Sequence, residues 1–345
     1  MWRRRGPPPP SMLLSMLHAQ VLGLPAHDNA LLVTATGGQS QTRLLFDCGA
    51  DVLDSLTVSE IGGIDHLLFS HFHMDHVSGF DAYFRINFNR AGPPNHVWGP
   101  PGSIGVLGHR FRGFLWNLTA GLSGVWYVHE LDGEQVRSAR FEAAEGFATA
   151  HDAGERRLNG QPFLSTPEAQ LTALPLSHHG LSLGYLLREP QRLAVDKDAL
   201  RRLGLKGGPW LAELKTTQAE SLDVNGVSMD AAALRAELLR PLPSDSLAYL
   251  SDFLLDDAQL ARLSPLLENV GTLYAEAQYG PEDTERADRN HHTTVVQVAE
   301  LARRAGVDRL RLLHLSRRYS PQEWAAWLTA ARTVFSATAY PEHWC

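Results

Sequence analysis

Residues 69–80 read FSHFHMDHVSGF, and they place three histidines and an aspartate within six positions of one another. The apolar run at residues 67–69 precedes this cluster, and apolar residues at helical spacing follow it. The pattern predicts a strand that runs into the cluster and a helix that begins within it. Imidazole nitrogens and carboxylate oxygens are ligands that zinc prefers. The cluster, which consists of His71, His73, Asp75 and His76, is therefore a candidate metal site.

A pair of metal ions that share an activated water needs more ligands than these residues supply. The other ligands must then come from distant strand ends. The candidates, each of which ends a predicted strand, are His178 or its neighbour His179, Asp252 and His314. The pattern alone does not choose between His178 and His179. The sequence thus indicates one site at the edge of a sheet, of the kind that two-metal hydrolases use.

The composition is that of an ordinary globular chain, with 345 residues, 44% of them hydrophobic and 20% charged. No apolar run approaches the roughly 18 residues of a membrane span, so no membrane association is expected. The only cysteines are Cys48 and Cys345, which cannot form a disulfide framework and therefore favour a reducing, cytoplasmic location. The net charge of −7 excludes a surface that binds nucleic acid throughout, but it permits a local basic patch.

Strand and helix patterns alternate along most of the chain, which predicts a mixed α/β (α+β) fold. Residues 104–150 mix both patterns and predict no definite element. Residues 188–244 differ from the rest, because they are rich in glycine and proline and have little continuous apolar sequence. Residues 1–11 are interpreted as a disordered tail or a mis-assigned start, which leaves a predicted domain at residues 12–345.

Further motifs lie outside the histidine cluster. The chain contains LFDCG at residues 45–49, Gly184-Tyr185 separated from His178 by five residues, Glu276-Ala277-Gln278, HTT and a later glutamine at residues 292–297, and HLSRRY at residues 314–319. Together with the cluster, these motifs resemble the metallo-β-lactamase superfamily and, within it, the ribonuclease Z family of endonucleases, which trim the 3′ trailer from precursor tRNA. Two positions depart from the family pattern, because Gln278 and Phe253 stand where threonine is usual.

The resemblance implies an αββα four-layer sandwich with a protruding arm. Residues 188–244 would be that arm, inserted into the domain to bind the body of the tRNA. Between Arg188 and Lys215 there are seven Lys/Arg against four Asp/Glu, a local excess of the charge that phosphate contacts need. Arg201, Arg202 and Lys206 are the candidate RNA-binding residues of this segment.

The resemblance also implies which residues hold the metal. Two Zn²⁺ ions are expected per chain, with Mn²⁺ as the alternative. The proposed ligands are His71, His73 and His178 for one ion, Asp75, His76 and His314 for the other, and Asp252 as the bridge between them. By the family's spacing, His179 is a neighbour and not a ligand.

Three further roles complete the predicted site. Asp75 is placed where a carboxylate can orient or deprotonate the attacking water. His292, oriented by Glu276, is expected to protonate the leaving oxygen as a general acid; the alternative is that it caps the helix that follows. Arg318 is expected to pair with a substrate phosphate, the alternative being a structural ion pair.

The expected function is that of a two-zinc phosphodiesterase, an endoribonuclease that acts on precursor tRNA as a cytoplasmic homodimer. One alternative is a phosphodiesterase for cyclic nucleotides or other small diesters. The other is a metal-binding, non-catalytic protein of the same fold that recognises RNA.

Overall fold

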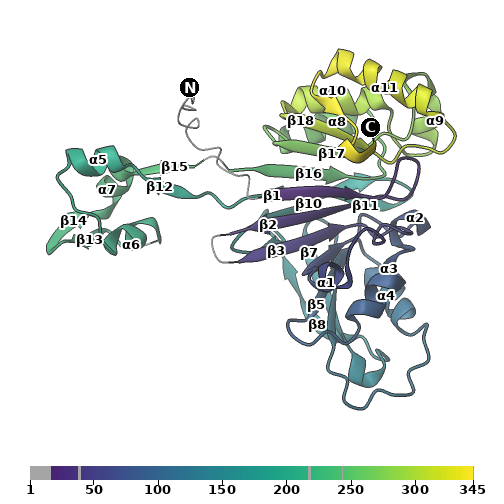
Figure 1. The fold of residues 1–345 in the computed structure, drawn as a ribbon, viewed down its shortest axis with the longest axis horizontal. Helices are drawn as coiled ribbons and strands as arrows, with labels where there is room; N and C mark the ends of the chain where they lie inside the picture. The colour runs from purple at the N-terminus through teal and green to yellow at the C-terminus, as the bar shows by residue number, and fades with distance from the viewer. Residues whose placement is uncertain (1–16, 38–39, 217–218, 243, 345) are drawn as a thin grey trace, which may run out of the picture. The chain divides into compact units, whose positions relative to one another are not determined.

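The computed structural model describes residues 17–344 except 38–39, 217–218 and 243. The tail or mis-assigned start predicted for residues 1–11 lies outside the described residues, as does Cys345. The chain divides into two compact units (Figure 1). The larger unit contains the residues up to Glu189 and those from Asp245 onward, and the smaller unit is Pro190–Ser244.

The first sheet of the larger unit has eight strands, whose spatial order follows the chain from β1 to β8. They are β1 (Leu17–Leu22), β2 (Ala30–Thr36), β3 (Gln41–Phe46), β4 (His66–Leu68), β5 (Asn95–Gly99), β6 (Val125–Leu131), β7 (Gln135–Glu142) and β8 (His151–Arg157). The neighbours from β3 to β6 are parallel, so their carboxyl ends meet at one edge of the sheet.

The second sheet has seven strands in the order β19-β18-β17-β16-β11-β10-β9. They are β9 (Leu164–Ser165), β10 (Gln170–Ser177), β11 (Leu181–Arg188), β16 (Ser246–Leu250), β17 (Thr272–Glu276), β18 (Arg309–Leu313) and β19 (Thr338–Ala339). The strands from β16 to β19 are parallel to one another. Strand β10 points the same way, because it is antiparallel to β11, which is antiparallel to β16.

Helices cover the outer face of each sheet. Those of the first sheet are α1 (Val58–Gly62), α2 (Met74–Val77), α3 (Phe80–Asn87) and α4 (Ser103–Phe111); those of the second are α8 (Asp257–Leu266), α9 (Thr284–Arg289), α10 (Val295–Ala305) and α11 (Pro321–Val334). Short 3₁₀ turns are η1 (Ala143–Glu145), η2 (Pro281–Asp283) and η3 (Glu342–Trp344). Among the described helices, none has both the length and the apolar character that crossing a bilayer requires.

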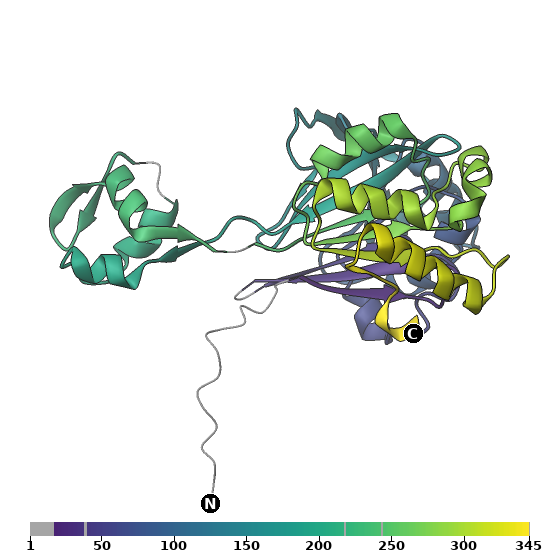
Figure 2. The same ribbon diagram turned by 90° about the horizontal axis from the view of Figure 1, so that it is seen from above.

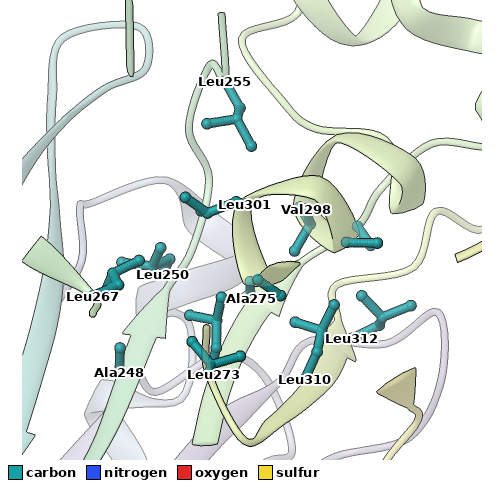
Figure 3. Close-up of a cluster of buried hydrophobic side chains, with 14 of the residues drawn as sticks. Ala248, Leu250, Leu255, Leu267, Leu273, Ala275, Val298, Leu301, Leu310 and Leu312 are labelled. Atoms are coloured by element: carbon teal, nitrogen blue, oxygen red, sulfur yellow. The ribbon is translucent and has the colours of Figure 1, made fainter. Parts of the chain in front are cut away.

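Three hydrophobic clusters hold the layers together. One packs α8, α10 and α11 against β16, β17 and β18, where side chains such as Leu273, Leu310 and Leu301 meet (Figure 3). A second packs α3 and α4 against the first sheet, and a third fills the space between the two sheets. In Figure 2 the helices α8, α10 and α11 lie side by side over their sheet. The predicted order of layers, helix, sheet, sheet and helix, is confirmed.

The smaller unit has a hydrophobic core of its own. It contains β12 (Leu193–Val195), α5 (Lys197–Arg202), α6 (Trp210–Thr216), β13 (Ser221–Val224), β14 (Val227–Asp230), α7 (Ala231–Leu238) and β15 (Leu239–Pro241). Trp210, Leu214 and Leu234 are buried in this core. The sequence pattern did not predict this core, because its apolar residues are scattered over several short elements.

Candidate metal centre

The candidate ligands lie at the carboxyl ends of four strands. His71 and His73 lie between β4 and α2, Asp75 and His76 lie in α2, and His178, Asp252 and His314 follow β10, β16 and β18. The strands of the second sheet that end here all point the same way, so the fold gathers residues that are far apart in the sequence. The seven residues predicted as ligands form two groups of closely spaced donor atoms, and Asp252 belongs to both.

The Asp252 carboxylate lies at the centre of these groups and is 2% exposed. Its Oδ2 atom lies 3.8 Å from His71 Nε2, 3.4 Å from His76 Nε2 and 3.9 Å from His178 Nε2, and its Oδ1 atom lies 3.6 Å from His314 Nε2. The two oxygens of one carboxylate thus face histidines of both groups. This is the position that a bridging ligand requires.

The remaining ligands complete the two groups. Asp75 Oδ2 lies 3.3 Å from His314 Nε2 and 3.6 Å from His76 Nε2. His73 Nδ1 lies 3.2 Å from His178 Nε2. One group therefore consists of three histidines with Asp252, and the other of two histidines and Asp75 with Asp252.

Two buried nitrogens in the centre lack a hydrogen-bond partner among the described residues. Nε2 of His71 and Nε2 of His76 form no hydrogen bond with any described residue. Leaving a buried polar atom unsatisfied costs about 1–3 kcal/mol, unless something binds to it. A mixed set of imidazole and carboxylate donors suits zinc and related transition metals. The residues present therefore fit a metal pair.

The outer ring nitrogens of the histidines are fixed by neighbouring groups. His76 Nδ1 lies 2.8 Å from Asp47 Oδ2, and His71 Nδ1 lies 3.1 Å from Ser70 Oγ. His178 Nδ1 lies 2.8 Å from the carbonyl oxygen of His291. Such contacts orient each ring, so that its other nitrogen faces the candidate metal site.

Asp47 links the two sheets beneath the centre. Besides His76, its carboxylate accepts hydrogen bonds from the Ser70 backbone N–H at 2.7 Å and from the Tyr249 hydroxyl at 2.8 Å. Asp47 is fully buried. In the sequence this residue stands out only as part of the LFDCG motif, which predicts no role for it. Its partner Tyr249 is distant in the sequence, so no local pattern indicates the contact.

Three residues of the centre have left-handed backbone conformations. The φ angles are 59° at Asp47, 46° at Asp252 and 56° at His314. Such angles are costly for residues other than glycine, and they persist where the surrounding structure enforces them. Each of these residues leaves a strand end in a sharp turn, which directs its side chain into the centre.

The electrostatics of the centre favour bound positive charge. Burial acts to lower the pKa of His76, but Asp252 and Asp47 raise it well above its usual value. Burial raises the pKa of Asp252, but His314 and His76 hold it well below its usual range. Burial lowers the pKa of His71 to about 2, which keeps this ring neutral as a metal ligand must be.

The sequence of this chain is 54% identical to ribonuclease Z of Deinococcus radiodurans over 329 residues, which make up 95% of this chain and 99% of that protein. The chain belongs to the ribonuclease Z family. A family model described as Anti-Pycsar protein Apyc1 matches residues 24–161.

Solved structures confirm the metallo-β-lactamase fold. The metallo-beta-lactamase fold protein YhfI from Bacillus subtilis aligns with a TM-score of 0.54 and 16% identity over 93% of this chain and 94% of that one. A long form RNase Z from yeast aligns with a TM-score of 0.51 and 11% identity over 90% of this chain and 39% of that one. The chain is therefore a metal-dependent hydrolase of the ribonuclease Z family.

The candidate general acid contacts the centre directly. His292 Nδ1 lies 3.1 Å from Glu276 Oε1 and 3.9 Å from Asp252 Oδ2. Burial opposes protonation of this ring, but Glu276 raises the pKa of His292 to about 9. The alternative role as a helix cap is not observed, because Thr294 is the N-cap of α10 and forms a capping box with Gln297.

The two departures from the ribonuclease Z pattern leave the ligand set intact. Gln278 Nε2 lies 3.2 Å from His314 Nδ1, so this side chain contacts the outer nitrogen of a proposed ligand. Phe253 is fully buried in the cluster beside α8 and α10, and its backbone N–H donates to Glu276 Oε1 at 2.8 Å. Both residues therefore support groups of the site.

The structure places the predicted substrate-binding residues in two regions. Arg318 lies in the larger unit and donates from Nη1 to the Tyr279 hydroxyl at 3.3 Å; among the described residues it forms no ion pair. Arg201, Arg202 and Lys206 lie in the smaller unit and are exposed, and Arg201 pairs with Asp198. His179 stacks on His291 at 4.9 Å between ring centroids and belongs to neither ligand group.

Proposed function

We propose that this chain cleaves the 3′ trailer from precursor tRNA with a pair of divalent metal ions. The observation that carries this proposal is a complete set of ligands around Asp252, with a His292–Glu276 pair beside it, in a chain 54% identical to a ribonuclease Z along 95% of its length. A protein that only binds RNA needs neither the open metal pair nor a buried proton donor.

The ligand groups described above support two ions per chain. His71, His73 and His178 would hold one, Asp75, His76 and His314 the other, and Asp252 both. We propose Zn²⁺ as the ion, with Mn²⁺ as the alternative, because histidine nitrogens dominate the set. When bound, the ions supply activation of the attacking water and neutralise the charge of the phosphodiester.

Two side chains are proposed to handle the protons of the reaction, Asp75 at the attacking water and His292 at the leaving oxygen. Asp75 is 45% exposed at its side chain, so it can reach a water molecule next to the centre and orient it. His292 holds its Nδ1 against Glu276, which leaves Nε2 as the atom that gives a proton to the leaving oxygen. Because Glu276 keeps this ring protonated near neutral pH, His292 is ready to act as the acid.

Recognition of the RNA is assigned to the smaller unit. Its exposed basic residues Arg201, Arg202 and Lys206 lie in and after α5. They can pair with phosphates without sequence preference, which suits an enzyme that must act on many different tRNAs. The expected homodimer and the expected cytoplasmic location remain predictions that accompany this proposal.

The test is to incubate the purified protein with one defined precursor tRNA and to map both product ends. We expect a single cut at the junction between the tRNA and its trailer, abolished by a chelator and restored by Zn²⁺ or Mn²⁺. An Asp252→Asn variant serves as the inactive control. Hydrolysis of a small diester without any cleavage of the precursor would contradict the assignment and favour the small-diester alternative.

A further inference from the structure

A cleft of about 550 Å³ opens from one side of the metal centre. Asp75 and His314, two of the proposed ligands, are among the residues that line it. Ala26, Asp28, Met74 and Arg317 also line it. The cleft therefore offers space beside two proposed ligands, next to the place where a scissile phosphate would bind.

Met74 forms one wall of the cleft. It is the first residue of α2, it lies between His73 and Asp75 in the chain, and it is 78% exposed. A single exposed apolar side chain needs no explanation on an ordinary surface. Here, however, the side chain lines the cleft and is adjacent in sequence to two proposed ligands. A methionine is unbranched and polarisable, so it can pack against flat rings of different shapes.

Arg317 is a second residue that lines the cleft. Its Nε donates to the carbonyl oxygen of Ala26 at 2.7 Å, and its Nη2 lies 3.8 Å from Asp28 Oδ1. The side chain remains 70% exposed, so the backbone contact fixes the guanidinium without covering it. A guanidinium held in this way can pair with a phosphate through its remaining N–H groups.

We propose that this cleft binds one nucleotide next to the scissile phosphate, with Met74 packed against the base and Arg317 paired with the adjoining phosphate. The inference rests on the proposed function and deepens it, because it assigns the residue that reads the base at the cleavage junction. Met74 touches no reacting atom in this arrangement. Its removal therefore changes the affinity for the substrate and the preference among bases, and it leaves the chemical step unchanged.

The experiment uses the full-length, metal-loaded protein and a set of precursor tRNAs that differ only in the nucleotide on either side of the cleavage junction. The variants are Met74→Ala and the conservative Met74→Leu, with Leu118→Ala as the matched control. Leu118 is also highly exposed, at 83%, and does not line the cleft. Hydrolysis of bis(p-nitrophenyl) phosphate is measured in parallel for every variant.

For Met74→Ala we expect KM to rise by about 2- to 12-fold, the range of a sulfur–aromatic interaction, with kcat nearly unchanged. The ranking of the four nucleotides should change at one side of the junction and not at the other. Met74→Leu keeps the apolar contact but lacks the sulfur, so it should restore the affinity only in part. Leu118→Ala should keep the wild-type KM, and every variant should hydrolyse the small diester at the wild-type rate.

For Arg317→Gln we expect the log–log dependence of affinity on salt to become shallower by about 0.7 to 0.9, the contribution of one neutralised phosphate. Arg137→Gln is the matched control, because Arg137 is 65% exposed at its side chain and also lies 3.8 Å from a carboxylate. It should leave the slope unchanged.

Wild-type KM and an unchanged nucleotide ranking in Met74→Ala would overturn this assignment while leaving the proposed function intact. Wild-type protein that hydrolyses the small diester but cuts none of the precursors would overturn the proposed function itself. A parallel loss of small-diester activity in Met74→Ala would overturn the assignment as well, because it would place Met74 in the support of the metal centre.

Discussion

The two units of the molecule differ in what their polar residues do. In the larger unit, polar side chains converge on a buried point, where Asp252 faces histidines from several strands. In the smaller unit, the basic side chains of Arg201, Arg202 and Lys206 point into solvent around a separate apolar core. Each hydrophobic cluster lies wholly within one unit. Under the proposed function, the larger unit carries out the chemistry and the separately packed smaller unit binds the RNA.

The largest effect is expected from Asp252→Asn. Asparagine tolerates the left-handed φ of 46° at this position, so the variant removes the charge with little strain on the backbone. If Asp252 bridges two ions as proposed, each ion loses a ligand in this variant, and the surrounding histidines lose their anionic partner. We expect loss of bound metal and of activity on both RNA and small diesters, measured by elemental analysis and by turnover. Full metal content in this variant would reject the bridging role.

His292→Ala tests the role of the general acid separately from the binding of metal. The variant should keep its metal and lose about 10²- to 10⁴-fold in turnover on RNA, the usual contribution of a general acid. A diester with a nitrophenolate leaving group needs little protonation and should lose much less. His291→Asn is the control, because it keeps the backbone carbonyl that contacts His178. An equal loss on both substrates would exclude the role as acid.

Replacing Arg201, Arg202 and Lys206 together by alanine tests whether the smaller unit binds the RNA. The affinity for precursor tRNA should fall, and the salt dependence should become shallower by about 0.7 to 0.9 for each phosphate that is no longer neutralised. Small-diester hydrolysis should not change. The matched control replaces Arg303 and Arg304 of α10, which pair with Glu300 in the larger unit. If the control weakens binding as much as the triple variant does, the RNA-binding surface is not confined to the smaller unit.

The smallest effect concerns acid stability of the larger unit. Burial lowers the pKa of His66 to about 3, of His96 to about 4 and of His129 to about 3. The unfolded chain binds protons at these rings below about pH 6.5, whereas the folded chain does so only at lower pH, so stability falls as the pH drops through this window.

Thermal unfolding between pH 4 and 7, at saturating metal, measures this effect. His129→Gln should flatten the fall in stability by up to about 1.4 kcal/mol per pH unit, the contribution of one ring. His18→Gln, an exposed position on β1, is the control. If stability falls equally steeply with pH in His129→Gln, groups other than His129 cause the loss of stability at low pH.

The sequence predicted the parts of the molecule whose signals are local. The cluster from His71 to His76 directly follows its strand, so one short stretch of sequence predicts both the strand and the candidate metal ligands. The choice of His178 over His179 required the family resemblance, because both follow the same strand. Strand β8 was missed because nearly all its side chains are exposed and carry no apolar alternation, so pairing with β7 defines it.

The features that the sequence did not predict depend on contacts between residues that are far apart in the chain. The hydrogen bond from Tyr249 to Asp47 joins two sheets and is fixed only when the layers pack. The contact of Gln278 with His314 likewise depends on two neighbouring strands ending side by side. No local pattern contains either contact, because each arises from tertiary packing. The apolar cleft wall at Met74 was missed for a related reason, since exposure of one side chain depends on what surrounds it.

The most direct test removes the smaller unit altogether. The residues at its two junctions already contact each other, because the Glu189 N–H donates to the Asp245 carbonyl at 3.0 Å and the Asp245 N–H donates to Glu189 Oε2 at 3.0 Å. A short Gly/Ser linker can therefore replace residues 190–244 without moving β11 or β16. The variant should keep its metal and its small-diester activity, lose most cleavage of precursor tRNA through weaker binding, and show a shallower salt dependence. Near-normal cleavage of precursor tRNA by this variant, or loss of the small-diester activity while the metal is retained, would contradict the separation of chemistry from recognition.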